Sequence, residues 1–267
     1  MPHWLKTTLR MAAIVGGASV AAVIGLVFVR QLISPDDLRA SSDSVGNYLQ
    51  TVGGIYAVLL AFIVYVVWNQ FNDSRSLVER EATALVDLHR TASGLPAATR
   101  REIQQALQVY VDEVITKEWY AMSHRDEATL EHVGAHLEHV WAAIHACEPR
   151  NECQHAIYGE VLSRFNDLSD LRTNRLTSSR AQIPLLMRLL LYFGAAIVVG
   201  SIYLMAFDRF WLHAVVTGAL SGAVAHILYL IYDLDNAFSG QLQVSTAPFV
   251  RARRAFDRAT HQVDSAA

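Results

Sequence analysis

Two carboxylates lie two positions apart where a long apolar segment ends, at Asp233 and Asp235. A charged group at the edge of a bilayer is costly, and it usually faces a bundle interior or water, where it has a function. Such a pair attracts a cation in one interpretation, or forms an ion pair, with Arg75 or Arg80 as candidates. In the other interpretation the Asn, Ser and Gly residues that follow end the helix, and this end is capped and solvated.

The apolar segment before this pair carries four polar side chains that can contact ions or water: His213, Thr217, Ser221 and His226. The first three are spaced four residues apart and therefore share one face of a helix. This stripe either lines a path for water or makes hydrogen bonds between helices. Gly218 and Gly222 form a small-xxx-small pattern, which lets helices approach closely within one protomer or between subunits. With the two aspartates, the four polar residues are the candidates for an ion path.

Metal-ligating residue types occur at two places. His132, His136 and His139 share one face of a helix, and two histidines four residues apart can bind zinc. Valine follows the first of them where a metalloprotease would have glutamate, so a solvated histidine face is the favoured interpretation and no metal is expected. A second set of four residues lies on both sides of a turn, and its spacing is unusual for zinc: His145, Cys147, Cys153 and His155. For these cysteines a metal site, a disulfide and free thiols stay open, with free thiols favoured in a reducing compartment.

Enzyme motifs are missing from the sequence. It has no phosphate-binding glycine loop, no Gly-x-Ser-x-Gly elbow and no His-Glu-x-x-His pair. We therefore expect no catalytic residue and no cofactor. The formal net charge of −3 and the lack of a basic patch outside the tail give no sign of nucleic-acid binding. The arginines of that tail follow a membrane span, where contact with lipid headgroups explains them.

Four apolar segments are long enough to cross a bilayer, which takes roughly 20 residues. They cover about residues 11–33, 52–68, 185–207 and 210–232. The first is longer than a signal-peptide core, so we expect it to be retained. Between the second and third spans, apolar residues recur at helical spacing, for example at Ile103, Leu107 and Tyr110. The sequence therefore predicts an all-α integral membrane protein with four transmembrane helices and a helical cytoplasmic domain inserted between spans two and three.

The predicted division of the chain follows these spans. An N-terminal membrane hairpin covers residues 1–71, the cytoplasmic domain 72–183, a C-terminal membrane hairpin 184–232 and a tail 233–267. Residues 34–48 read as a loop, and residues 72–95 continue span two as a helix without a break. Pro184 either kinks a helix that enters span three or begins a new one.

Basic residues near the span ends predict the orientation. The N-terminal segment, both ends of the region between spans two and three, and the tail carry lysine or arginine close to the spans. The loop after span one is acidic, and the turn between spans three and four has only Arg209. Both termini and the middle domain are therefore expected in the cytoplasm.

Several stretches together resemble a known family. The segment Glu79-Arg-Glu-Ala-Thr-Ala follows span two, Glu118-Trp119 lies in a later helix, and Phe238-Ser-Gly240 follows span four. This pattern resembles the bacterial bestrophin-like family of four-span membrane proteins, over most of the chain. The resemblance implies structural roles for the residues of these motifs: Glu79, Glu81, Glu118, Trp119, Phe238, Ser239 and Gly240. We expect Glu81 and Glu118 to form buried ion pairs, with Arg75, Arg80 and Arg172 as candidate partners.

The family name implies kinship with bestrophins, which are oligomeric anion channels. It therefore implies a homo-oligomer in the inner membrane of a bacterium, with ions as possible partners besides the lipid. The acidic calcium-binding clasp of animal bestrophins has no counterpart here, so calcium gating does not carry over. The alternatives to a channel are a non-conducting membrane scaffold and a stator-like subunit that works with a partner protein. The latter needs a carboxylate in mid-span from the partner, because this chain has none.

Overall fold

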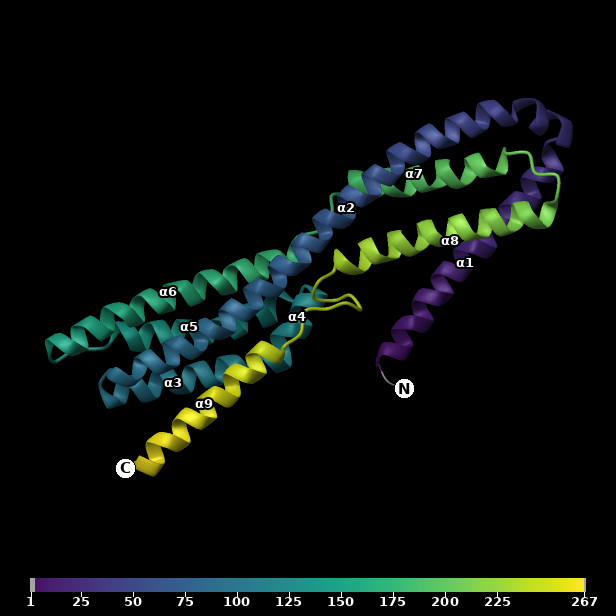
Figure 1. The fold of residues 1–267 in the computed structure, drawn as a ribbon. Coiled ribbons are helices and arrows are strands. Elements are labelled where there is room, and N and C mark those ends of the chain that lie inside the picture. The colour runs from purple at the N-terminus through teal and green to yellow at the C-terminus, as the bar shows by residue number, and fades with distance from the viewer. Residues whose placement is uncertain (1–2, 267) are drawn as a thin grey trace. The chain divides into compact units, whose positions relative to one another are not determined.

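The computed structural model describes residues 3–266, and the side chains of residues 8–34, 38–39 and 43–259. All regular structure in residues 3–266 is helical, and no strand occurs there (Figure 1). The α-helices are α1 His3–Leu32, α2 Pro35–Thr91, α3 Ala97–Glu113, α4 Trp119–His124, α5 Glu127–His145, α6 Glu152–Arg180, α7 Leu185–Tyr203, α8 Phe210–Leu234 and α9 Ala247–Ala266. A 3₁₀ turn, Ala92–Gly94, follows α2, and a π turn, Val114–Glu118, joins α3 to α4. The all-α prediction is confirmed.

Four stretches of helix in the described chain are long and apolar enough to cross a membrane. They lie within Thr8–Leu32, Asp43–Gly94, Glu152–Tyr203 and Phe210–Leu234. Their number and order agree with the four predicted spans. The second and third stretches are far longer than one bilayer crossing, which takes roughly 20 residues, because each includes helix beyond its apolar part.

The chain divides into two compact units. Unit 1 comprises Met1–Asn69 and Gln182–Asp235, and unit 2 comprises Gln70–Ala181 and Asn236–Ala267. Unit 1 thus holds α1, the first part of α2, α7 and α8. Unit 2 holds the rest of α2 together with α3 to α6 and α9. The apolar segments at about residues 11–33, 52–68, 185–207 and 210–232 all belong to unit 1.

Close packing of α1 on α8 builds one side of unit 1 (Figure 1). Small residues on α8 make it possible. A Cβ atom on Gly222 would lie 2.7 Å from Ser19 Oγ, and one on Gly218 would lie 3.5 Å from a methyl group of Val23. Ser19 Oγ donates a hydrogen bond of 2.9 Å to the carbonyl oxygen of Gly218. The two glycines therefore bring helices together within one chain, as the packing interpretation of the small-xxx-small pattern requires.

In unit 2 the helices bury the apolar faces that their sequences predict. Ile103, Leu107 and Tyr110 of α3 are fully buried, as is Val140 of α5, and α3 packs on α5 and α9. Side-chain caps begin two of the helices. The carboxylate of Asp126 accepts from the backbone N–H of Thr129 at the start of α5, and an asparagine does the same before α6.

The structure corrects the predicted loop at residues 34–48 and shows which role Pro184 has. Residues 34–48 were expected to form a loop, but α2 begins at Pro35 and runs through them. Proline followed by two aspartates is a sequence that starts helices, and the loop prediction weighed only the charge of this segment. At Pro184 the chain starts a new helix, since α6 ends at Arg180 and Pro184 directly precedes α7.

Candidate functional site

A network of buried charge lies at the centre of unit 2. The side chains of Glu81 on α2, Glu118 at the end of the π turn and Arg175 on α6 are all 0% exposed. Arg175 Nε donates to Glu81 Oε2 at 2.6 Å, and its Nη2 donates to Glu81 Oε1 at 3.1 Å. The same Nη2 donates to Glu118 Oε2 at 2.8 Å. One guanidinium therefore binds two carboxylates that come from different helices, and it binds the first in a bidentate manner.

Further groups complete the network. Arg172 Nη2 donates to Glu118 Oε1 at 2.6 Å and to the carbonyl oxygen of Leu130 at 2.8 Å. The hydroxyl of Tyr110 donates to Glu81 Oε1 at 2.7 Å. Two arginines thus face two glutamates, so the formal charges cancel.

Aromatic rings and a thioether enclose the buried guanidinium. The rings of Trp119 and Phe249 have their centroids 6.0 and 5.5 Å from the Cζ atom of Arg175. Its Nη1 lies 3.0 Å from the sulfur of Met122. Cation–π contacts of this kind stabilise a cation that is out of contact with water.

The electrostatics favour a structural role for this network. Burial raises the pKa of the Tyr110 hydroxyl well above its ordinary value, and the Glu81 and Glu118 carboxylates raise it further. Tyr110 therefore stays protonated and keeps donating. Both carboxylates are bound by guanidinium groups of the network, so it fixes helices rather than presenting a group that reacts.

Arg175 is the member of the network that sequence reasoning missed as a partner. Of the three arginines considered, only Arg172 binds one of the two glutamates. A signal was present, because Arg175 follows Val161, Phe165 and Leu168 on the face of α6 that the core buries. A charged residue at a core position of a helix needs a buried counter-charge.

On α8 the predicted polar stripe is buried in the packing of unit 1. His213 and Thr217 are 0% exposed. His213 Nε2 lies 2.8 Å from the carbonyl oxygen of Ile202, and its ring stacks on Phe207 at 4.5 Å. Ser221 Oγ donates a long hydrogen bond of 3.4 Å to the carbonyl oxygen of Ala18 on α1. The stripe therefore faces neighbouring helices of the same chain.

Two polar atoms of this stripe have no hydrogen-bond partner among the described residues: His213 Nδ1 and Thr217 Oγ1. Both are buried, and a buried polar atom without a protein partner is a place where an ordered water binds. His226 differs from the other three, because it lies on an exposed part of α8. The structure thus brings three of the four polar candidates together and leaves the fourth apart.

At the end of α8 both aspartates are buried. Asp235 Oδ1 accepts a hydrogen bond of 2.8 Å from the backbone N–H of Ile183, and its Oδ2 lies 3.3 Å from Arg188 Nη2. This carboxylate therefore links the end of α8 to the chain that enters α7. Its cationic partner comes from α7, whereas Arg75 and Arg80 were the candidates from the sequence.

The two cysteines are free thiols, with Cys147 buried and Cys153 exposed. Neither they nor His145 and His155 belong to a group of metal-ligating atoms among the described residues.

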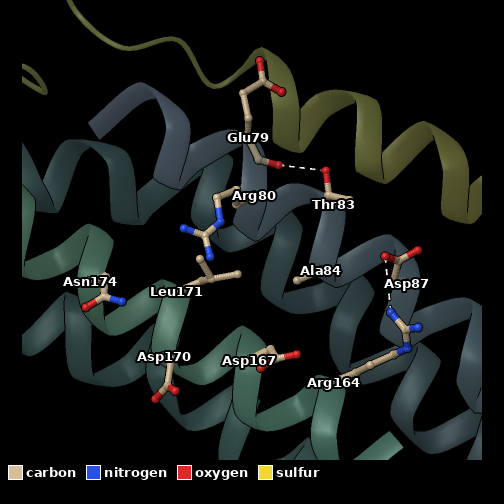
Figure 2. Close-up of a pocket in the computed structure, with 10 residues that line it drawn as sticks. All are labelled: Glu79, Arg80, Thr83, Ala84, Asp87, Arg164, Asp167, Asp170, Leu171 and Asn174. Carbon is tan, nitrogen blue, oxygen red and sulfur yellow. Dashed lines mark hydrogen bonds and ion pairs between the residues drawn. The ribbon is translucent and has the colours of Figure 1, made fainter. Parts of the chain in front are cut away.

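An open groove of about 600 Å³ lies in unit 2 between α2 and α6 (Figure 2). Its charged lining contains four carboxylates and two guanidiniums: Glu79, Asp87, Asp167, Asp170, Arg80 and Arg164. Arg164 Nη1 lies 3.4 Å from Asp87 Oδ2 across the groove. Charged and polar side chains make up most of its lining.

Comparison with known families identifies the chain. The model of the bestrophin-like domain matches residues 16–249. The chain belongs to the bestrophin-like family. Among curated proteins none matches it.

Solved structures agree with the family. A variant of a bacterial bestrophin homologue from Klebsiella pneumoniae matches with a TM-score of 0.68 and 15% identity, over 96% of this chain and 99% of that one. Another variant of that homologue gives 0.67 and 14%, over 94% and 98%. A structure described only as a membrane protein gives 0.67 and 14%, over 93% and 96%. The family resemblance of the sequence is thus confirmed, and the helices follow the bestrophin fold.

The residues of the bestrophin-like motifs make packing, turn and ion-pair contacts in unit 2. Trp119 makes edge-to-face contacts with Phe238 and Phe249, at 5.5 and 6.0 Å between ring centroids. The backbone N–H groups of Ser239 and Gly240 donate to the carbonyl oxygen of Asn236 and close a tight turn. Glu79 is exposed and pairs with Arg251 of α9 at 2.6 Å.

Proposed function

We propose that this bestrophin-like protein is one subunit of an oligomeric ion channel in the inner membrane of a bacterium. Unit 2 and both termini lie in the cytoplasm in this proposal, as the distribution of lysine and arginine predicts. The observation that carries it is the family match over residues 16–249, because kinship with bestrophins implies an oligomeric channel. Fold likeness alone is a weak argument for function, so conduction needs a direct test.

The packing of unit 1 supports an ion path that lies between copies of the chain. His213, Thr217 and Ser221 face other helices of their own chain, so an ion reaches them only if water enters that packing. Unit 1 also exposes large apolar side chains along α2, among them Ile55, Val58 and Phe62. Lipid or a second copy must cover this face.

Ion flux in liposomes tests the proposal. Purified protein is reconstituted, and chloride and potassium fluxes are measured against empty vesicles and against vesicles with heat-denatured protein. We expect flux that scales with protein content. If the flux equals that of empty vesicles while the protein is folded and oligomeric, the scaffold alternative replaces the channel.

Asp235→Asn should change the ion selectivity of such a channel. The substitution leaves the charge of Arg188 without its carboxylate, so the local charge rises by one. A carboxylate near a path concentrates cations. A cation path should therefore lose conductance in this variant, and an anion path should gain. The measurement is flux at low ionic strength, where screening is weakest.

Arg188→Gln is the matched control for that variant. It removes the cation and keeps the carboxylate, so it should shift selectivity in the opposite direction. If neither variant changes the flux, Asp235 and Arg188 only hold the end of α8 to the start of α7.

Thiol labelling tests the orientation. Cys153 is exposed and Cys147 is buried. A membrane-impermeant maleimide should leave Cys153 unlabelled from the periplasmic side and label it after permeabilisation. Cys147 should react only on unfolding, and Cys153→Ser should abolish the early labelling. Labelling of Cys153 in intact spheroplasts would place unit 2 outside and overturn the topology.

A further inference from the structure

We propose that Glu113, His132 and His136 form a binding site for a divalent transition-metal ion, with zinc as the best fit, at the surface of unit 2. Glu113 is the last residue of α3, and the two histidines lie one turn apart on α5, which packs on α3. From the sequence alone a solvated histidine face was favoured. The structure adds a carboxylate from another helix, 19 residues before the first histidine.

The geometry is close to that of a zinc site. Glu113 Oε2 lies 2.9 Å from His136 Nε2 and 3.7 Å from His132 Nε2. One ligand atom from each of the three residues lies within 4.8 Å of the other two. In a tetrahedral site with Zn–N and Zn–O bonds of about 2.0–2.1 Å, neighbouring ligand atoms are separated by about 3.3 Å. Two of the three separations lie on either side of that value and the third is at most 4.8 Å, so small side-chain rotations are enough to admit the ion.

The types of ligand select the metal. Two imidazoles and one carboxylate suit zinc, copper or nickel, whereas calcium and magnesium prefer oxygen ligands alone. Three protein ligands leave a fourth position open to water. The His132 side chain is 63% exposed, against 18% for His136 and 16% for Glu113. An ion can therefore enter from the side of His132 and meet two partly buried ligands.

Lys117 orients the carboxylate of Glu113. Its Nζ binds Glu113 Oε1 at 2.6 Å and leaves Oε2 facing the histidines. A carboxylate must be deprotonated to bind a metal, and an ordinary glutamate is deprotonated at neutral pH. A group that orients a ligand in this way tunes affinity.

His139 is a natural control within the same helix. Its ring lies 6.2 Å from that of His136, but it does not belong to the group of ligand atoms among the described residues. A diffuse affinity of a histidine-rich surface would involve all three histidines. The proposed site involves only His132 and His136.

Zinc binding to the purified full-length protein tests this proposal. The protein carries a histidine-free affinity tag, is stripped with a chelator, and is titrated with zinc chloride against a chromophoric zinc indicator. We expect one zinc per chain, displacing the indicator, with magnesium chloride inactive. His132→Gln should weaken binding by at least about tenfold, since loss of even an outer-shell partner costs 10–100-fold. Because His132 is exposed, this variant should fold.

The remaining variants distinguish a defined zinc site from unspecific zinc binding by a histidine-rich surface. Glu113→Gln should weaken binding as His132→Gln does, and His139→Gln should bind like the wild type. Zinc should also raise the melting temperature of the wild type and of His139→Gln, but not that of His132→Gln, since a ligand of the folded state stabilises it. Equal weakening in His139→Gln, or unchanged binding in His132→Gln, would show adventitious binding and overturn the proposal.

Discussion

Arg175→Met is expected to be the most damaging substitution in unit 2. Methionine has a similar length but no charge, so Glu81 and Glu118 would keep two buried carboxylates with only Arg172 to offset them. Breaking a buried ion pair by removing one partner costs about 3–5 kcal/mol. At about 2–4 °C per kcal/mol for a domain of 150–250 residues, the apparent melting temperature in detergent should fall by roughly 6–20 °C.

Arg180→Met is the matched control on the same helix. Arg180 pairs with Glu127 at the surface, and exposed pairs contribute about 0–1 kcal/mol. The two variants remove the same chemical group, so a difference between them measures burial. Similar melting temperatures would contradict the proposed role of the network.

A triple variant separates charge from packing. In Glu81→Leu, Glu118→Leu, Arg175→Met the buried charges at the centre are replaced together, and Arg172, whose side chain is 15% exposed, keeps its hydrogen bond to the carbonyl oxygen of Leu130. Replacing a whole buried ion network by apolar groups is often neutral or stabilising. The triple variant should therefore melt above Arg175→Met alone. If it melts lower, the shape of the guanidinium matters more than its charge.

Gly194→Ala is expected to have the largest effect in unit 1. A Cβ atom at Gly194 on α7 would lie 2.5 Å from a ring carbon of Tyr56 on α2. The hydroxyl of Tyr56 donates to the carbonyl oxygen of Leu191 at 2.9 Å, which holds the ring in place. Overpacking of this kind costs about 1–3 kcal/mol, so the variant should melt below the wild type in detergent.

Gly200→Ala, on the same helix, should have the opposite sign. A Cβ there meets no atom within 4 Å, and alanine is better than glycine in a helix by roughly 0.5–1 kcal/mol. In a chain that already carries Tyr56→Ala, Gly194→Ala should no longer be destabilising, because the ring that its Cβ would meet is absent. A double-mutant cycle measures this difference. If Gly194→Ala is neutral in the presence of Tyr56, then α2 and α7 are not packed as closely as described.

Helical periodicity and the length of apolar segments predicted most of this fold. Both are properties of residues close together in the sequence. Ile103 and Leu107, for example, lie four residues apart and therefore share one face of a helix. The helix at residues 34–48 was missed because an acidic stretch next to a span looked like a loop, although Pro35 marks a helix start.

The candidate site was harder to predict, because its contacts join distant residues. Glu81 and Glu118 stood out through the family motif, but nothing local to them points to Arg175. Likewise His132 and His136 show a metal spacing, whereas Glu113 lies in a different helix. A sequence reveals which groups need partners, and only the packing of helices shows which partners they have.

The sequence distances within the buried network constrain how the protein folds during synthesis. Arg175 binds Glu81 across 94 positions and Glu118 across 57. When α2 leaves the ribosome, its glutamate therefore has no counter-ion and must remain in water until α6 has been made. Phe249, which lies over the guanidinium, follows another 74 residues after Arg175. At about 5–20 residues per second, the core of unit 2 remains incomplete for seconds after α6 has been made, so its helices close around that charge only once α9 has been synthesised.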